Sequence, residues 1–177
     1  KKATDTIILV GNSQGIMQRD VTAKHKVVSA INDHDIIVRM NGGYRAGGDD
    51  LTSKLGRAAD YWSFSTHEYS VYKQWKKLHP HAIELRLNNR LEYTAMGGYN
   101  GDLKTYKSLI EDYGHLRPST GLVTIHYITR YCNSKLSIIG FDFFKTNNWY
   151  TQTCGAPVHD WKREKEYISS MSKVTIL

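Results

Sequence analysis

The 177-residue sequence is 40% hydrophobic and 23% charged, a composition that supports one folded domain with a buried core and excludes wholesale disorder. It contains no run close to the roughly 18 apolar residues that a transmembrane helix needs. Lys and Arg number 24 against 17 Asp and Glu, and the net charge of +7 favours an anionic partner. A nucleotide or nucleotide sugar, a nucleic acid and an anionic membrane surface are all partners of the required negative charge.

The two cysteines, Cys132 and Cys154, do not form a C-x-x-C pair. This argues against a disulfide framework and against a cysteine-based zinc site. The first residues also lack the apolar segment that is typical of a signal peptide. A reducing, cytoplasmic location is therefore expected.

Short apolar runs alternate along the chain with longer stretches of helical periodicity. Strands are expected at residues 6–10, 35–40, 61–65, 82–87 and 136–140. Helices are expected at residues 22–32, 68–78, 104–113, 121–132 and 160–171, and residues 174–177 follow the last of them. The alternation predicts a single Rossmann-like α/β domain over residues 1–177, with a mostly parallel sheet and helices on both faces.

Three segments follow the predicted strands and contain glycine or polar residues. They span residues 11–15, 41–50 and 142–159. In open α/β sheets, ligands bind at the loops that follow the carboxyl ends of the strands. We therefore predict that loops 41–50 and 145–158 border an active site, and that the second of them closes over it as a lid that excludes water.

The first of these segments, Gly11-Asn12-Ser13-Gln14-Gly15, is not a dinucleotide fingerprint, because Ser13 stands where the middle glycine would be. No P-loop lysine follows it either. Its backbone N–H groups and the Asn12 amide suit a phosphate or a ribose, although an ordinary strand–helix turn explains the residues equally well. Asn41, at the tip of the second strand, is expected to face an anion or a sugar hydroxyl, or to cap the turn into Gly42.

Arg117-Pro118-Ser119-Thr120-Gly121 opens an apolar helix. Ser119 or Thr120 is a natural N-cap, and Gly121 permits close approach of the backbone. The N–H groups and the positive end of this helix predict a phosphate cradle. Capping explains the hydroxyl residues but does not explain the glycine.

Carboxylates give little sign of a metal site. Asp33-His34-Asp35 formally matches a D-x-D metal motif, but it precedes a strand and is better interpreted as a turn. Asp49-Asp50 in the glycine-rich loop stays an alternative. A site without metal is expected.

His159 begins the last predicted helix, after the loop that returns from the fifth strand. A free imidazole has a pKa of about 6.5 and can act as a general base at neutral pH. Glu164 lies five positions later. It either orients the helix that begins at His159 or is simply solvated, and the solvated side chain is favoured.

Taken together and in this order, the motifs resemble those of the sialyltransferases. Residues 8–41 resemble the large sialyl motif of the eukaryote-type family. The helix start at 117–121, followed by Cys132, resembles the small motif. His159 and Glu164 fit the H-x-x-x-x-E pattern of the terminal motif.

Two details refine the resemblance. The eukaryote-type enzymes usually carry a cysteine before the first strand that pairs with the small-motif cysteine, whereas residues 3–6 here read Ala-Thr-Asp-Thr. Residues 140–143 are similar to a Gly-x-Asp-Phe segment of related bacterial enzymes. The chain therefore resembles a bacterial or viral relative of the family.

The resemblance implies a GT-A-variant, Rossmann-like fold and metal-independent, inverting transfer from a CMP-activated sugar. His159 would be the general base, and Tyr150 would donate to the leaving phosphate. By similarity, the residues that would bind the donor nucleotide are Asn12, Ser13, Asn41, Ser119, Thr120, Gly121, Phe141, Asp142 and Phe143.

The implied partners are a CMP-sugar donor and a glycan or glycolipid acceptor, with peripheral membrane association as an option and no nucleic acid. Sialic acid and Kdo, another 2-keto sugar acid, are not separated as donors. A non-catalytic α/β module that binds a nucleotide or nucleic acid is the alternative from a different class. An NAD-type oxidoreductase is disfavoured by the incomplete glycine fingerprint.

Overall fold

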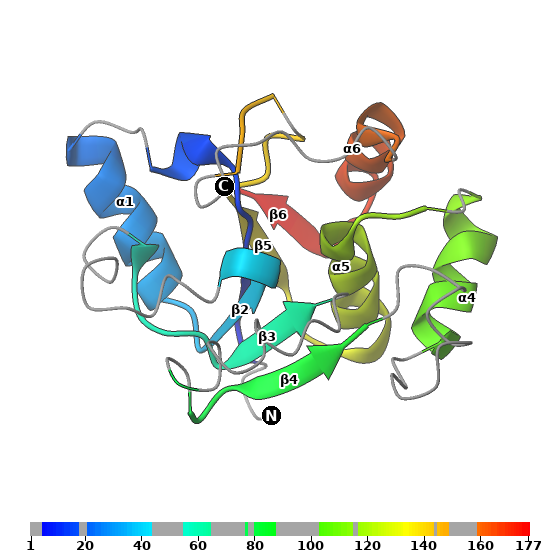
Figure 1. The fold of residues 1–177 in the computed structure, drawn as a ribbon, viewed down its shortest axis with the longest axis horizontal. Helices are drawn as coiled ribbons and strands as arrows, with labels where there is room; N and C mark the ends of the chain where they lie inside the picture. Colours follow the sequence, from blue (N-terminus) through cyan, green and yellow to red (C-terminus); the bar gives the residue numbers. More distant parts are fainter. Residues whose placement is uncertain are drawn as a thin grey trace.

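The computed structural model is a single six-stranded sheet with helices on both faces (Figure 1). It describes residues 5–17, 21–43, 55–64, 77, 80–87, 103–114, 117–143, 145–148 and 159–177. The strands are β1 Ile7–Val10, β2 Ile36–Met40, β3 Tyr61–Phe64, β4 Ile83–Arg86, β5 Leu136–Ile139 and β6 Val174–Ile176. They pair in the order β4-β3-β2-β1-β5-β6, and every pairing is parallel. The predicted α/β fold with a mostly parallel sheet is confirmed.

The described helices lie close to where the hydrophobic pattern places them. They are α1 Val21–Asn32, α4 Leu103–Tyr113, α5 Thr120–Tyr131, α6 Trp161–Ser169 and the short 3-10 helix η1 Gln14–Ile16. The helix predicted at 68–78 lies almost entirely outside the described residues. Among the described helices, none is long and apolar enough to cross a membrane.

The strands of the sheet centre are buried on both faces, which explains their continuous apolar runs. All four residues of β1 are buried. Ile7 and Leu9 join the core cluster formed with α4, α5 and α6, whereas Ile8 and Val10 join the cluster beneath α1. Alternate side chains of one strand therefore hold the two helical layers on opposite sides of the sheet.

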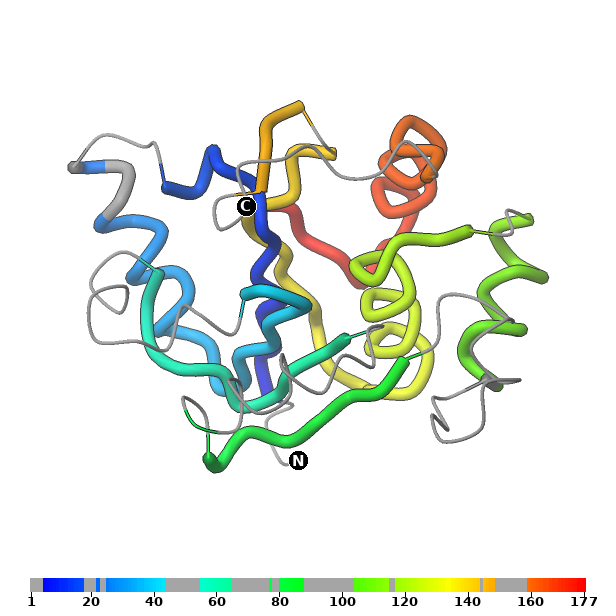
Figure 2. Tube along the Cα trace, viewed as in Figure 1, coloured from blue at the N-terminus to red at the C-terminus, as the bar shows by residue number. Residues whose placement is uncertain are grey.

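The strand order places a topological switch point at β1. The chain steps from β1 through β2 and β3 to β4 on one side, and it then returns to place β5 on the other side of β1. Figure 2 shows the first strand, in blue, running beside the yellow-to-gold segment near residues 136–143. In open α/β sheets, ligands bind at the carboxyl ends of the strands at such a point.

Candidate functional site

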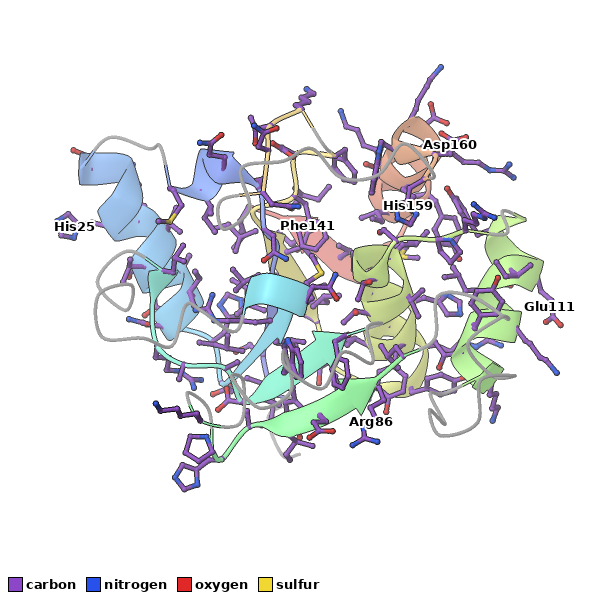
Figure 3. The ribbon with its side chains drawn as sticks, viewed as in Figure 1. His25, Arg86, Glu111, Phe141, His159 and Asp160 are labelled. Carbon is purple, nitrogen blue, oxygen red and sulfur yellow. The ribbon has the colours of Figure 1, made fainter. Side chains whose placement is uncertain are left out.

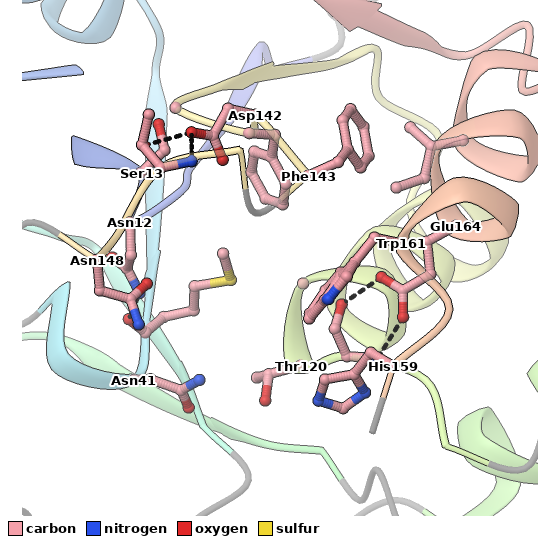
Figure 4. Close-up of a pocket in the computed structure, with 17 residues that line it drawn as sticks. Asn12, Ser13, Asn41, Thr120, Asp142, Phe143, Asn148, His159, Trp161 and Glu164 are labelled. Atoms are coloured by element: carbon pink, nitrogen blue, oxygen red, sulfur yellow. Dashed lines mark hydrogen bonds between the residues drawn. The ribbon is translucent and has the colours of Figure 1, made fainter. Parts of the chain in front are cut away.

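A pocket of about 220 Å³ lies at this switch point (Figure 4). It is bordered by the segments that follow β1, β2 and β5 and by the first turns of α5 and α6. Its lining residues are Asn12, Ser13, Met40, Asn41, Ser119, Thr120, Gly121, Gly140, Phe141, Asp142, Phe143, Thr146, Asn148, His159, Trp161, Glu164 and Ile168. The structure thus brings His159 and all nine residues predicted to bind the donor nucleotide into one cavity. The beginnings of loops 41–50 and 145–158 border it too.

The floor of the pocket is made by the close approach of the segments after β1 and β5. The Gly11 N–H donates to the Ile139 carbonyl at 2.7 Å, and the Ser13 N–H donates to the Gly140 carbonyl at 3.1 Å. A Cβ atom on Gly11 would lie 2.3 Å from the Gly140 oxygen. Glycine at position 11 is therefore required by packing.

We expect Gly11→Ala to lower the free energy of unfolding by about 1–3 kcal/mol, because overpacking forces backbone shifts. Gly15→Ala is the matched control, since the nearest atom to its Cβ would be Ser13 Oγ at an ordinary 3.8 Å. Its effect should stay within about 0.5 kcal/mol. Urea unfolding of both variants measures the difference, and equal stabilities would contradict the argument.

The Phe141 ring leaves no space for a side chain at Gly121, the glycine at the start of α5. A Cβ atom on Gly121 would lie 2.8 Å from Phe141 Cε1, and a Cβ atom on Gly11 would lie 2.9 Å from Phe141 Cδ2. The ring therefore occupies the space left by the two glycines. The half-buried Phe141 joins the end of β1 to the start of α5 and forms one wall of the pocket.

Two asparagines line the side of the pocket nearest β2. The Asn12 side-chain amide donates to the Met40 carbonyl at 3.0 Å. Asn41 has a φ of 46°, a left-handed conformation that asparagine tolerates better than most residues, and its carbonyl accepts from Trp62 Nε1 at 2.8 Å. The side-chain oxygen of Asn41 is buried and has no hydrogen-bond partner within the described residues. It is placed to accept from a hydroxyl or amino group of a ligand.

Asp142 holds the loop after β5 in shape. Its carboxylate accepts from the Thr146 N–H at 2.9 Å and from the Thr146 hydroxyl. Phe143, between them, has a φ of 54°, a conformation that costs a bulky residue about 1–3 kcal/mol. Asn148 forms an antiparallel bridge with Ser13, so this loop is tied to the segment after β1.

A buried carboxylate from α6 lies against the start of α5. Ser119 is the N-cap, and its hydroxyl accepts from the Leu122 N–H at 3.1 Å. Glu164 Oε1 accepts from the Ser119 N–H at 2.7 Å, and Glu164 Oε2 accepts from the Ser119 hydroxyl at 2.6 Å (dashed lines in Figure 4). Glu164 is only 2% exposed.

The prediction that Glu164 is solvated is therefore wrong. Glu164 and Ile168 are four residues apart and form the buried face of α6, which packs beside α5. Burial raises the pKa of the Glu164 carboxyl from 4.5 to about 7, although the two hydrogen bonds from Ser119 oppose the rise. At neutral pH both protonation states of this carboxyl are populated.

His159 lies just before α6, and Figure 3 shows it at the start of that helix. Its Nδ1 atom is 2.7 Å from the Arg117 carbonyl oxygen, an acceptor that assigns the proton of the neutral ring to Nδ1 and the lone pair to Nε2. The Trp161 ring packs edge-on against the imidazole, with centroids 4.8 Å apart. The backbone and one aromatic neighbour therefore orient a basic nitrogen at the pocket.

Several residues of the pocket were not predicted from the sequence. Trp161, Thr146 and Asn148 line the cavity without belonging to any of the motifs. Trp161 lies two residues after His159 at the start of a helix, and Thr146 and Asn148 lie in a predicted active-site loop. Those positions were the signals that could have identified them.

Other predicted features lie elsewhere or outside the described residues. Residues 33–35 lie at the amino end of β2, where Asp35 accepts from the Thr6 N–H at 2.8 Å, as expected of a turn. Tyr150, Cys154 and Asp49-Asp50 lie outside the described residues. Within the described ranges, no group of three His, Cys, Asp or Glu side chains is arranged to bind a metal ion.

Comparisons with known proteins do not assign a family. The sequence matches no protein-family model, and a search of curated proteins finds no significantly similar sequence. The resemblance of its motifs to the sialyl motifs stays a prediction.

Proposed function

We propose that the protein is a sialyltransferase-like glycosyltransferase that transfers a 2-keto sugar acid from a CMP-activated donor to a glycan hydroxyl. The observation that carries the proposal is that residues far apart in the sequence meet in one pocket. Residues near positions 12, 119 and 159, which belong to three separate motifs, line one pocket. A candidate nucleotide site and a candidate base therefore share one cavity at the switch point, where α/β folds bind their ligands.

The start of α5 supports binding of the donor phosphate. The first N–H groups of an α-helix and its positive end attract anions, and Ser119, Thr120 and Gly121 place this helix start in the pocket wall. CMP leaves as a phosphate monoester. Preorganised N–H donors and the helix dipole supply stabilisation for the charge that develops on this leaving group.

His159 supports the acceptor half of the reaction. Nε2 would take the proton of the acceptor hydroxyl as its oxygen forms a bond to C2 of the donor sugar. The bond from C2 to the phosphate oxygen breaks, and its electron pair leaves with CMP. Attack on the face opposite the leaving group inverts the configuration at C2.

Nucleotide selectivity tests the proposal. We expect CMP to raise the melting temperature by several degrees, because a ligand at about 100 times its Kd stabilises the folded state by ~2.7 kcal/mol. CDP, UDP, GDP and NAD at equal concentration should stabilise less, and EDTA should not change the response to CMP. Thermal-shift measurements check this directly.

The same panel separates the alternatives. A larger, metal-dependent shift with a nucleoside diphosphate would contradict the donor assignment. Selective CMP binding without turnover of CMP-sialic acid or CMP-Kdo would favour a non-catalytic nucleotide-binding module. Turnover of one donor and not the other would identify the sugar.

A further inference from the structure

Glu164 is buried beside the proposed phosphate site, and none of the transfer steps proposed above uses it. Its two oxygens accept both hydrogen bonds that the N-cap residue of α5 can donate, one from the Ser119 N–H and one from the Ser119 hydroxyl. Ser119 and Glu164 both line the pocket. This pair therefore connects a buried, titratable group to the start of α5.

The Ser119 hydroxyl oxygen is tetrahedral, so bonds and hydrogen bonds can form in four directions around it. One is its own Cβ, a second faces Glu164 Oε2 at 2.6 Å, and a third accepts from the Leu122 N–H at 3.1 Å. One direction is left. What occupies it depends on the position of the single hydroxyl hydrogen.

The protonation state of Glu164 decides that position. When Glu164 is ionised, the Ser119 hydrogen must point to Oε2, because a carboxylate only accepts. The fourth direction is then a lone pair, which repels an anion. When Glu164 is protonated, its own O–H donates to the Ser119 oxygen, and the Ser119 hydrogen turns into the fourth direction as a donor.

We propose that Glu164 is a positioning residue that, on protonation, converts the Ser119 hydroxyl from an acceptor into a hydrogen-bond donor for the phosphate of the bound nucleotide. The inference rests on the proposed function, since it assigns the phosphate to the start of α5. The proton comes from solvent and is bound together with the ligand. Phosphate affinity should therefore fall as the pH rises and Glu164 ionises.

The surroundings of Glu164 bring the pKa of its carboxyl close to neutral pH. Burial raises the pKa of its carboxyl to about 7, and the negative charge of Asp160 adds to the rise. Tyr113 of α4 faces it but stays neutral, because burial raises the pKa of the phenol. Arg163 lies over the Tyr113 ring, 5.2 Å from its centroid. His159 lines the same pocket, so a test of Glu164 must keep this imidazole unchanged.

The test measures the pH dependence of binding for a ligand that does not itself titrate. Cytidine 5′-(methyl phosphate), a phosphodiester like the sugar donor, keeps a single negative charge across the neutral range of pH. Calorimetry would give its Kd for the wild-type protein, Glu164→Gln and Ser119→Ala. The glutamine introduced by Glu164→Gln is an isosteric stand-in for the protonated acid, because its amide donates to Ser119 Oγ at every pH, and His159 is the same in all three proteins.

For the wild-type protein we expect the affinity to fall about tenfold as the pH rises through about 7, because the ligand phosphate loses one charge-assisted hydrogen bond. Glu164→Gln should keep the high affinity at alkaline pH. Ser119→Ala should bind weakly throughout. Calorimetry at slightly alkaline pH in buffers of different ionisation enthalpy should also show proton uptake by the wild-type protein that Glu164→Gln lacks.

Parallel pH profiles for the wild-type protein and Glu164→Gln, with equal proton uptake, would overturn the inference while leaving CMP binding intact. Absence of binding by all three folded proteins would contradict the proposed function itself, and this inference with it. Thermal unfolding of each variant establishes that it is folded. A purely structural role for Glu164 would change stability without changing the pH profile of binding.

Discussion

We expect His159→Ala to lower the rate of sugar transfer by roughly 10²–10⁴-fold, the contribution typical of a general base. The Arg117 carbonyl accepts the Nδ1 proton, so the substitution removes the basic Nε2 that we propose takes the proton of the acceptor hydroxyl. In the proposed function other residues bind the nucleotide, so CMP affinity should change little. Steady-state transfer from CMP-sialic acid to a glycan acceptor measures the first effect, and calorimetry with CMP measures the second.

His25→Ala is the matched control for this prediction. His25 is exposed on α1, and Figure 3 shows it on the opposite side of the molecule from His159. Its removal should leave transfer unchanged. Near-normal transfer by His159→Ala would show that another group takes the acceptor proton, whereas a parallel loss of CMP affinity would place the imidazole at the nucleotide instead.

Glu164→Gln should stabilise the protein at alkaline pH, even though it removes a charged hydrogen-bond acceptor. Burial raises the pKa of Glu164 from 4.5 to about 7, and each pKa unit corresponds to about 1.4 kcal/mol. A carboxyl whose pKa is higher when folded contributes stability below about pH 4.5 that is lost as the pH rises through about 7. The glutamine side chain keeps both bonds to Ser119 without this loss.

The two proteins should therefore be similarly stable near pH 4.5. By about pH 8 the variant should be more stable, with an upper bound on the order of 3 kcal/mol. Urea unfolding across this range measures the difference. Glu166→Gln is the control, because Glu166 is exposed on the same helix, and it should leave the pH dependence unchanged. A variant that is less stable than the wild type at alkaline pH would show that ionised Glu164 is net stabilising.

Local patterns were sufficient to predict most of the fold. The β-branched run of β1 and the periodic stretch of α5 are long enough to show their type without tertiary information. The short strand β6 was not identified, because three residues, of which Thr175 and Ile176 are exposed, carry no strand pattern. It forms by pairing with β5, a partner more than 30 residues away.

The sequence by itself determined the alternation of strands and helices, and with it the edge of the sheet at which open α/β folds bind their ligands. It also identified the motif residues that now line the pocket, from Asn12 to His159. Only the tertiary structure decided which of these side chains act on one another. The burial of Glu164 against Ser119, 45 positions away, and the wedge of Phe141 between Gly11 and Gly121 both depend on how helices and loops pack. No local pattern encodes such packing. The sequence of a helix is the same whether its charged residue is exposed to solvent or buried against a neighbouring helix.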